Sequence, residues 1–296
     1  MQELFAQHGI FCAEQEPMAR HTSFQIGGPA DWFVRPVGKE QLKTALSLVQ
    51  KEKVPYFILG NGSNLLVGDR GFRGAVIQPE LTAMEWKENQ LTCGSSILLV
   101  RAAREAAKKG LGGLEFASGI PGSVGGAVRM NAGAYGGEIK DVVRSVEYYD
   151  PATGCFETIS GEELQFSYRH SVFCELPGVV ICEATLALRP EQPEQILSQM
   201  EELNRRRREK QPVSLPSAGS TFKRPEGHFA AALIDRAGLR GMRVGGAQVS
   251  EKHTGFIVNT GGATSKDVKD LMHEVTKEVQ RQFGVTLEAE ICMIGE

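Results

Sequence analysis

Glycine is concentrated in one stretch of the chain. The stretch is GLEFASGIPGSVGGAVRMNAGAYGGEI, residues 113–139, and it carries eight glycines, a single proline and few charges. A shorter segment, GNGSN, spans residues 60–64. Glycine leaves the backbone uncovered and reaches conformations that other residues avoid. Segments of this kind either form tight turns or leave backbone N–H groups open to a ligand.

Two known phosphate-binding motifs do not fit these segments. A P-loop requires G-x-x-x-x-G-K-[ST], and no lysine follows the required glycine. A dinucleotide fingerprint requires G-x-G-x-x-G between a strand and a helix. GNGSNL starts correctly, but Leu65 replaces the third glycine and the strand-like LLV follows. Two alternatives remain: tight surface turns, or two loops, Gly60 to Asn64 and Gly119 to Gly126, that grip one diphosphate from two sides through free N–H groups.

Length, charge and cysteine content restrict the class of protein. The 296 residues suffice for two or three packed units, and a net charge of -3 gives no reason to expect a nucleic acid or an anionic membrane as partner. The six cysteines are scattered without a C-x-x-C pair, so neither a metal site nor a thiol nucleophile is predicted. The chain start lacks a signal-peptide pattern, and no apolar run approaches the roughly 20 residues of a membrane span, so we expect a cytoplasmic protein.

The hydrophobic pattern predicts mixed helices and strands in three zones. The first zone, about 24–77, contains strands at 31–37, 56–59 and 65–67 and an amphipathic helix at 39–52, whose apolar stripe is Leu42, Ala45, Leu46 and Val49. The second, about 81–188, has a helix at 95–110 that ends at Gly110, the glycine stretch, and strands at 143–150, 155–160 and 178–188.

A proline-flanked helix between residues 189 and 216 separates the third zone from the others. In the third zone, residues 263–284 show helical spacing of apolar residues. Thr264 and Asp267 can form a capping box, and Gly284 supplies the C-terminal stop.

Seven segments in a fixed order carry a family resemblance. They are HTSFQIGGPAD (21–31), LGNGSNLLVGD (59–69), the glycine stretch, YRHSVF (168–173), SAGSTFKRP (217–225), GGAQVSEKHTGFIVN (245–259) and LEAEICMIG (287–295). Over almost its whole length the chain resembles the UDP-N-acetylenolpyruvoylglucosamine reductases, flavoenzymes of peptidoglycan precursor synthesis. The resemblance implies an α+β fold: a two-lobed FAD-binding domain of the vanillyl-alcohol-oxidase type, with lobes at 1–80 and 81–195, and a C-terminal α+β substrate-binding domain at 196–296.

The same resemblance implies FAD and NADPH as cofactors. The family pattern assigns FAD binding to the two glycine loops, to residues beside the flavin, and to one arginine: Gly60, Asn61, Gly62, Ser63, Asn64, Pro121, Gly122, Ser123, Gly125, Gly126, Asn131, Gly133, Ala134 and Arg207. Covalently flavinylated relatives in this fold group tend to have a histidine in the first loop. Ser63 and Asn64 stand here instead, so we expect FAD to be bound without a covalent link.

The implied reaction reduces the enolpyruvyl ether of UDP-N-acetylenolpyruvoylglucosamine. Hydride addition builds negative charge on the substrate's carboxylate side, so the protein must stabilise an enediolate and protonate a carbon atom. The family motifs assign the cation to Arg169, its partner at the intermediate to Glu290, and the proton donor to Ser220. From residue type alone, these would be a surface arginine, a solvated strand carboxylate and a turn residue.

Substrate contacts and departures from the family pattern complete the expectations. Tyr168, Arg224 and His253 lie in matching motifs and are assigned to the UDP or sugar, with a structural role as the alternative for His253. Many relatives have a basic residue at the position of Gln25 and an arginine at that of Cys292. The short segment between residues 171 and 188 leaves no room for the tyrosine-bearing loop of one subgroup, which places the chain in the shorter subgroup.

Two other functions compete with the reductase. An oxidase of the same fold would lack the constellation of Arg169, Ser220 and Glu290. A nucleotide-sugar binder without flavin would not need intact glycine loops. The sequence does not define the oligomeric state.

Overall fold

In the computed structural model, which describes all residues 1–296, the chain forms two compact units that alternate along the sequence. Unit 1 contains residues 1–14, 32–61 and 74–206, and unit 2 contains residues 15–31, 62–73 and 207–296. The GNGSN segment is therefore shared, with Gly60 and Asn61 in unit 1 and residues 62–64 in unit 2. The division expected from the sequence, with boundaries at 80 and 195, stays a prediction.

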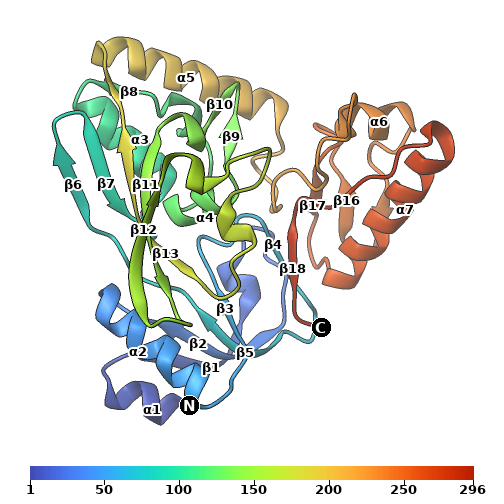
Figure 1. Cartoon of the computed structure of the whole chain (residues 1–296). Coiled ribbons are helices and arrows are strands. Elements are labelled where there is room, and N and C mark those ends of the chain that lie inside the picture. Colours follow the sequence, from blue (N-terminus) through green and yellow to red (C-terminus); the bar gives the residue numbers. More distant parts are fainter. The chain divides into compact units, whose positions relative to one another are not determined.

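The first layer of unit 1 is a four-stranded sheet, most of whose residues belong to this unit (Figure 1). Its order is β1-β2-β5-β3, and its strands are β1 (Phe11–Pro17), β2 (Pro29–Arg35), β5 (Phe72–Ile77) and β3 (Tyr56–Ile58). Helices α1 (Gln2–Gln7) and α2 (Gly38–Lys51) share a hydrophobic core with β2 and β5. The predicted apolar stripe of α2 is confirmed, because Leu42, Ala45, Leu46 and Val49 are all fully buried.

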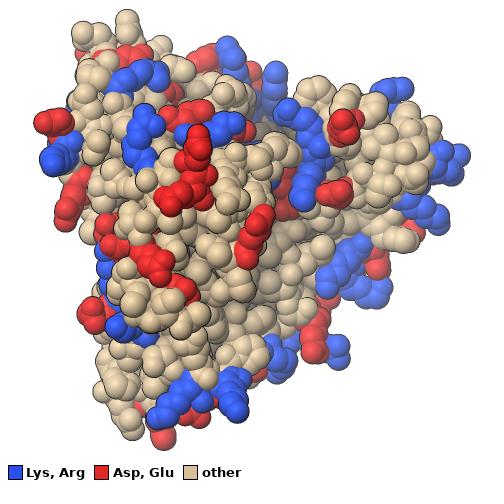
Figure 2. Space-filling view, viewed as in Figure 1, with Lys and Arg blue, Asp and Glu red and all other residues tan.

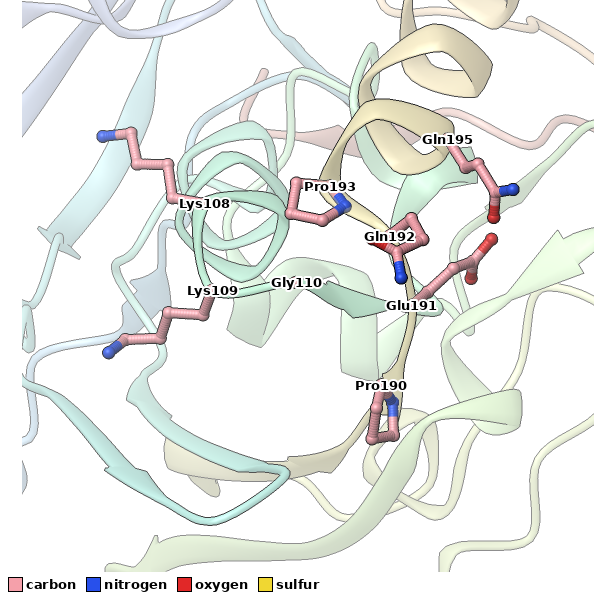
Figure 3. A pocket seen from close by; sticks show the side chains of 8 residues that line it. All are labelled: Lys108, Lys109, Gly110, Pro190, Glu191, Gln192, Pro193 and Gln195. Carbon is pink, nitrogen blue, oxygen red and sulfur yellow. The ribbon is translucent and has the colours of Figure 1, made fainter.

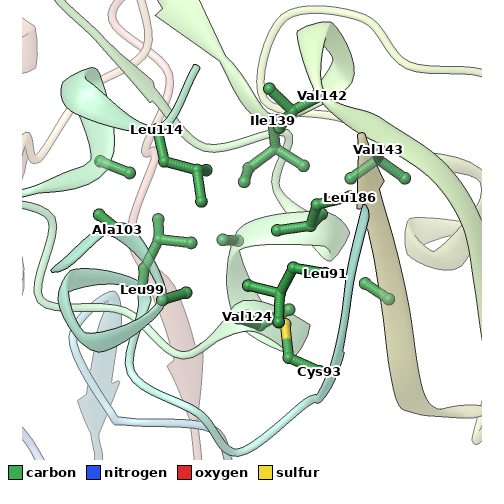
Figure 4. Packing of buried hydrophobic residues seen from close by; sticks show 14 of the residues in the cluster. Leu91, Cys93, Leu99, Ala103, Leu114, Val124, Ile139, Val142, Val143 and Leu186 are labelled. Atoms are coloured by element: carbon green, nitrogen blue, oxygen red, sulfur yellow. The ribbon is translucent and has the colours of Figure 1, made fainter. Parts of the chain in front are cut away.

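A five-stranded antiparallel sheet forms the second layer of unit 1. Its order is β12-β11-β13-β7-β6, with β12 (Cys155–Ser160), β11 (Val143–Asp150), β13 (Val180–Ala187), β7 (Gln90–Gly94) and β6 (Met84–Lys87). Helices α3 (Leu99–Lys108) and α4 (Val124–Arg129) pack against it. Figure 4 shows Leu99 of α3, Val124 of α4 and Leu186 of β13 turned toward one another in this core.

Short elements complete unit 1. They are the strand pairs β8 (Leu111–Gly112) with β14 (Arg189–Pro190) and β9 (Gly133–Ala134) with β10 (Gly137–Glu138), and the 3₁₀ turns η2 (Glu115–Ala117), η3 (Ile139–Asp141), η4 (Gly161–Leu164) and η5 (Val172–Cys174). Helix α5 (Pro193–Lys210) buries Ile196 and Met200 in the core of the five-stranded sheet.

Unit 2 is built around a small antiparallel sheet and one long helix. The sheet has the order β15-β16-β17, with β15 (Arg243–Val244), β16 (Ala247–Val249) and β17 (Ile257–Asn259). Helices α6 (Ala230–Arg236) and α7 (Ser265–Phe283) enclose its core. The unit also contains η1 (Met18–His21) and the parallel pair β4 (Leu65–Val67) with β18 (Cys292–Ile294).

Most expected elements are confirmed, but the helices α1, α4 and α6 were not predicted. Helix α7 begins with the predicted capping box of Thr264 and Asp267 and ends at Gly284 in the left-handed conformation. Helix α4, in contrast, lies inside the glycine stretch, where the sequence predicts loops. Two glycines lower its helix propensity. The Ser123 side chain at its N-cap and the core contacts of Val124 and Val128 compensate.

Candidate active site

The two glycine segments contact each other within unit 1. Asn61 Nδ2 donates a hydrogen bond to the carbonyl oxygen of Pro121 at 2.5 Å, and Gln78 Nε2 donates to the Gly60 carbonyl at 2.9 Å. A Cβ atom at Gly60 would lie 2.7 Å from Ser123 Oγ. The end of β3 and the start of α4 therefore lie side by side, as the sequence predicts for two loops that act together.

The second loop presents backbone N–H groups. Ser123 begins α4, and its Oγ accepts a hydrogen bond from the Gly126 N–H at 3.3 Å. Val124 N donates to the carbonyl of Ile97 at 2.8 Å, which fixes the loop against the residues that precede α3. The N–H groups of Gly122 and Ser123 donate to no protein acceptor. These two donors are suited to phosphate oxygens.

The first loop has the same property. The backbone N–H groups of residues 61–64 donate to no protein acceptor. Within unit 2, the Gly62 carbonyl accepts a hydrogen bond from Ser23 N at 3.1 Å. Gly62 has a φ of +62°, and a Cβ atom there would lie 2.0 Å from the carbonyl oxygen of His21. Consecutive free donors on uncovered backbone fit the pyrophosphate of FAD and need no basic side chain.

Asn131 follows α4 and is completely buried. Its Nδ2 donates to the Ser167 carbonyl at 2.9 Å and to Glu138 Oε2 at 3.2 Å, and its Oδ1 accepts from Lys140 N at 3.1 Å. The Lys140 ammonium, 2.7 Å from Glu138 Oε2, lowers the pKa of that carboxyl. Each polar atom of the Asn131 side chain therefore bonds to protein, and the assignment of Asn131 to the flavin stays a prediction.

Arg169 lies on a tight turn in unit 1. The turn runs from Ser167 to His170, and Arg169 has a left-handed φ of +55°. The half-buried guanidinium donates to the Gly133 carbonyl at 3.4 Å and lies 5.1 Å from the centre of the Tyr168 ring. The structure thus brings Arg169 together with the β9 segment, which carries Gly133 and Ala134, both assigned to the flavin.

Ser220 and Glu290 lie on adjacent segments of unit 2. Glu290 N donates to the carbonyl of Thr221 at 2.8 Å, so the residue after Ser220 is hydrogen-bonded to Glu290. On the other side, Asn64 Nδ2 donates to the Glu290 carbonyl at 3.2 Å, and Cys292 N donates to the Asn64 carbonyl at 3.0 Å. Both Ser220 and Glu290 are partly exposed. Two of the three assigned catalytic residues, Ser220 and Glu290, therefore lie on hydrogen-bonded segments of unit 2. The third, Arg169, belongs to unit 1.

The residues assigned to substrate differ in exposure. Arg224 is exposed, with its guanidinium 4.9 Å from the centre of the exposed Phe229 ring. His253 Nδ1 accepts a hydrogen bond from Gly255 N at 3.2 Å, and its ring stands edge-to-face with Phe256 at 5.0 Å. Burial lowers the pKa of His253. The hydrogen bond to Nδ1 is compatible with either role, and the assignment of His253 to the substrate stays a prediction.

The basic run at the end of α5 is mostly solvated. Within unit 1, Arg205 Nε and Arg206 Nε donate to the Glu202 carboxylate at 2.8 and 2.6 Å, and all three side chains are well exposed. Arg207, the first residue of the last unit 2 segment, is partly buried. Its assignment to FAD stays a prediction.

A surface cavity of about 700 Å³ lies elsewhere in unit 1 (Figure 3). It is lined by Lys108, Lys109, Gly110, Pro190, Glu191, Gln192, Pro193 and Gln195. In Figure 3 the side chains of Lys108 and Lys109 extend away from Glu191. None of the residues assigned to cofactor or substrate lines this cavity, and its walls are mainly charged and amide side chains. The glycine loops, rather than this cavity, are therefore the candidate cofactor site.

The surface charges, the metal-ligand patterns and the helix compositions add three observations. Acidic and basic side chains are interspersed over the face seen in Figure 2. No group of three or more His, Cys, Asp or Glu side chains is arranged to hold a metal ion. Among the helices, none has the length and apolar character needed to cross a bilayer.

Two residues at the site were missed by sequence reasoning. Thr221 is buried next to Ser220, and its Oγ1 accepts a hydrogen bond from Ile257 N at 3.0 Å. Its place in the SAGSTF segment could have drawn attention to it. Gln78, which holds the Gly60 carbonyl, lies outside every motif, so no sequence signal pointed to it.

Comparison with known proteins defines the class and then the family. Residues 30–160 match the FAD binding domain family, and residues 211–294 match the family of UDP-N-acetylenolpyruvoylglucosamine reductase C-terminal domains. The fold and the glycine loops thus belong to a flavoprotein in which an FAD-binding domain precedes a second α+β domain, which confirms the expected fold class.

Closely similar proteins identify the family. The chain is 48% identical over 95% of its length to the UDP-N-acetylenolpyruvoylglucosamine reductase of Clostridioides difficile (strain 630), covering 92% of that protein, and 49% identical with the same coverage to that of Clostridium botulinum (strain 657 / Type Ba4). The crystal structure of the reductase from Thermus caldophilus superposes with a TM-score of 0.82 at 39% identity, covering 96% of this chain and 98% of that one. The chain belongs to the UDP-N-acetylenolpyruvoylglucosamine reductase family.

Proposed function

We propose that this protein reduces UDP-N-acetylenolpyruvoylglucosamine to UDP-N-acetylmuramate with NADPH, using non-covalently bound FAD, in peptidoglycan precursor synthesis. The observation that carries the proposal is the contact between the two glycine loops, with Asn61 bonded to Pro121 at 2.5 Å, in a chain of this family. Because NADPH and UDP-sugars are cytoplasmic metabolites, we place the reaction in the cytoplasm.

The bare backbone of the two loops is proposed to hold the FAD diphosphate. The free N–H groups of residues 61–64 and of Gly122 and Ser123 supply donors without a positive side chain. Asn61 and Gln78 bind the carbonyls of Pro121 and Gly60, respectively. With these carbonyls held, the loop N–H groups stay available for a ligand. The loops therefore bind through backbone that is already ordered.

The chemistry defines what the side chains must do. When bound, FAD would supply to the terminal carbon of the enolpyruvyl double bond a hydride that originates from NADPH. The electron pair of that bond then moves to the neighbouring carbon and its carboxylate, which gives an enediolate on the substrate. This carbon must receive one proton to complete the lactyl ether. The protein has to stabilise the charge, exclude water and deliver the proton.

Three residues are proposed for these tasks. Arg169 faces the substrate carboxylate, since a guanidinium offers paired donors and keeps its proton. Ser220 donates the proton to carbon. A serine is a weak acid, so its hydroxyl needs a neighbour that stabilises the alkoxide during transfer. Glu290, joined to the Ser220 segment through Thr221, is proposed as the partner of the intermediate in its protonated form, because a carboxylate would repel the enediolate.

The remaining assignments concern substrate binding. Tyr168 and Arg224 present an aromatic ring and a guanidinium, groups suited to a sugar nucleotide. We place His253 at the substrate as a neutral side chain. NADPH and the UDP-sugar are proposed to bind in turn at one site.

Stopped-flow absorbance tests the function and its acid together. The purified protein should be yellow, lose flavin absorbance with NADPH, and recover it rapidly when UDP-N-acetylenolpyruvoylglucosamine is added without oxygen. Ser220→Ala should keep the first phase and slow the second by about 100-fold or more, in the range of general-acid catalysis. Ser217→Ala, three residues away and without an assigned role, is the matched control. Reoxidation by oxygen but not by the substrate would contradict the proposal and indicate an oxidase.

A further inference from the structure

Thr221 connects three segments of unit 2. Its backbone N–H donates to the carbonyl of Gly255 at 2.9 Å, and its Oγ1 accepts from Ile257 N at 3.0 Å. Its carbonyl accepts from Glu290 N at 2.8 Å. Backbone and side chain of this one residue therefore join the Ser220 segment to the start of β17 and to the segment of Glu290.

We infer that Thr221 is a positioning residue that fixes Ser220 and Glu290 relative to each other for protonation of the substrate carbon. The inference rests on the proposed function, because it takes the roles of these two residues from it. Thr221 itself is 1% exposed, so it does not contact substrate. Its role is to fix its own backbone, to which Ser220 is joined by one peptide bond.

The hydroxyl is the part of Thr221 that the neighbouring geometry requires. Ile257 is 1% exposed, so its N–H has no access to water and depends on Thr221 Oγ1 as acceptor. Without that acceptor, the segment has to shift or the N–H remains unpaired. A shift of Thr221 moves Ser220 through one peptide bond and Glu290 through the 2.8 Å hydrogen bond. Proton transfer depends steeply on such distances.

The Glu290 backbone is held from its other side by Asn64. Asn64 Nδ2 donates to the Glu290 carbonyl at 3.2 Å, and the Asn64 carbonyl accepts from Cys292 N at 3.0 Å. The Asn64 contacts therefore oppose movement of Glu290 when Thr221 is displaced. As a result, Ser220 should move more than Glu290. The relative position of the two groups should change, rather than both moving together.

Four variants separate this role from a purely structural one. Thr221→Val keeps the shape and loses the acceptor, whereas Thr221→Ser keeps it. Thr264→Ala removes the N-cap hydroxyl of α7, which accepts from Asp267 N at 3.0 Å, and serves as a control for a lost hydroxyl contact in unit 2 away from Ser220. Ser220→Ala reports on the proposed acid itself. Each protein is assayed with FAD bound, for reduction by NADPH and for anaerobic reoxidation by UDP-N-acetylenolpyruvoylglucosamine.

Thr221→Val should reduce the reoxidation rate by about 10-fold to 100-fold, while NADPH reduction stays within about twofold. Its solvent deuterium isotope effect on reoxidation should exceed that of the wild type, because proton transfer becomes slower. Thr221→Ser should stay within about threefold of the wild type and Thr264→Ala within about twofold. If Thr221→Val does not fold, Thr221→Cys replaces it, since a thiol is a weak acceptor, with a reoxidation rate at least about threefold lower expected.

The outcomes separate the inference from the function on which it rests. The positioning role is overturned if Ser220→Ala is slow in reoxidation but Thr221→Val reoxidises at the wild-type rate. The same holds for Thr221→Cys where that variant replaces Thr221→Val. Either result leaves the proposed acid in place. Equal slowing in Thr221→Val and Thr264→Ala overturns it as well, because that result reflects general destabilisation. Wild-type reoxidation in Ser220→Ala removes the proposed acid, and the positioning role falls with it.

Discussion

The side-chain amide of Asn131 donates a hydrogen bond to the carbonyl oxygen of Ser167 at 2.9 Å, although 36 residues separate the two. This contact fastens the turn that carries Arg169 to the segment that follows the glycine loops. Arg169 adds a second link through the Gly133 carbonyl at 3.4 Å. The proposed charge-stabilising arginine is therefore held by the same stretch of chain that is assigned to the flavin.

Replacement of Asn131 by aspartate tests this link. Asn131→Asp loses the donors to Ser167 and Glu138 and places a carboxylate at a fully buried position next to Glu138. We expect the free energy of unfolding to fall by about 2–4 kcal/mol, since buried groups lose their partners and a charge is left uncompensated. Urea unfolding measures this. Asn204→Asp, which loses one contact to Ser118 Oγ at a partly exposed position, should cost less than about 1 kcal/mol.

Two adjacent glycines of α4 should respond differently to alanine. At Gly125 a Cβ atom would lie 2.8 Å from Ser95 Cβ, so Gly125→Ala should destabilise the protein with or without FAD. At Gly126 the nearest atom would be Ser123 Oγ at 3.4 Å, an ordinary contact. Gly126→Ala should leave the apoprotein as stable or about 0.5–1 kcal/mol more stable, because alanine favours the helix.

If the bare backbone at Gly126 serves the cofactor, Gly126→Ala should still weaken FAD binding. Fluorescence titration of the apoprotein with FAD measures the affinity, and thermal unfolding of the same sample measures stability. An increase in the dissociation constant without a loss of stability is expected. Unchanged FAD affinity in Gly126→Ala would show that the absence of a side chain there has no role in binding.

Asp267 predicts a pH dependence of stability. The Thr264 backbone N–H donates to its carboxylate at 3.0 Å, and this hydrogen bond, with a further one from the Gly246 N–H, lowers the pKa of Asp267. In the unfolded chain an aspartate has a pKa of about 3.9. Its contribution is therefore fully present above that value and is lost as the pH falls through the lower pKa of the folded state.

Urea unfolding of wild type and Asp267→Asn between pH 6 and 3 measures this contribution. The difference in stability should be constant above about pH 5 and should shrink below about pH 4. Asp235→Asn, which loses an exposed ion pair with Arg240, is the control for a surface carboxylate. A difference between wild type and Asp267→Asn that does not change down to pH 3 would contradict the assignment.

The cysteines should divide by reactivity. Burial raises the pKa of Cys93 and of Cys182 to about 12, so neither forms a thiolate at neutral pH. Cys155 and Cys292 are exposed. In a thiol titration of the folded protein at pH 8, these two should react first, and Cys93 and Cys182 should react only after denaturation. Cys292→Ser should remove one fast equivalent, and reaction of Cys93 in the folded state would contradict the assignment.

Local sequence patterns predicted the long elements because their signals are local. The stripe of Leu42, Ala45, Leu46 and Val49 repeats at helical spacing, and all four side chains are buried in α2 as expected. The Thr264 and Asp267 capping box and Gly284 bound α7 within a residue of the predicted ends. Helix α4 escaped prediction because V-G-G-A-V-R has little helix propensity of its own, and its stability comes from Ser123 and from core packing.

The sequence by itself determined most of the long helices and strands, the two glycine segments and, through seven ordered motifs, the family. Only the tertiary structure decided that residues 15–31 and 62–73 join residues 207–296 in one unit, that Asn61 meets Pro121, and that Thr221 lies between Ile257 and Glu290. The reason is physical: periodicity and capping act over a few residues, whereas these pairings join groups far apart in the chain. They form only when packing brings the segments together, and a buried donor such as the Ile257 N–H then takes a side-chain acceptor.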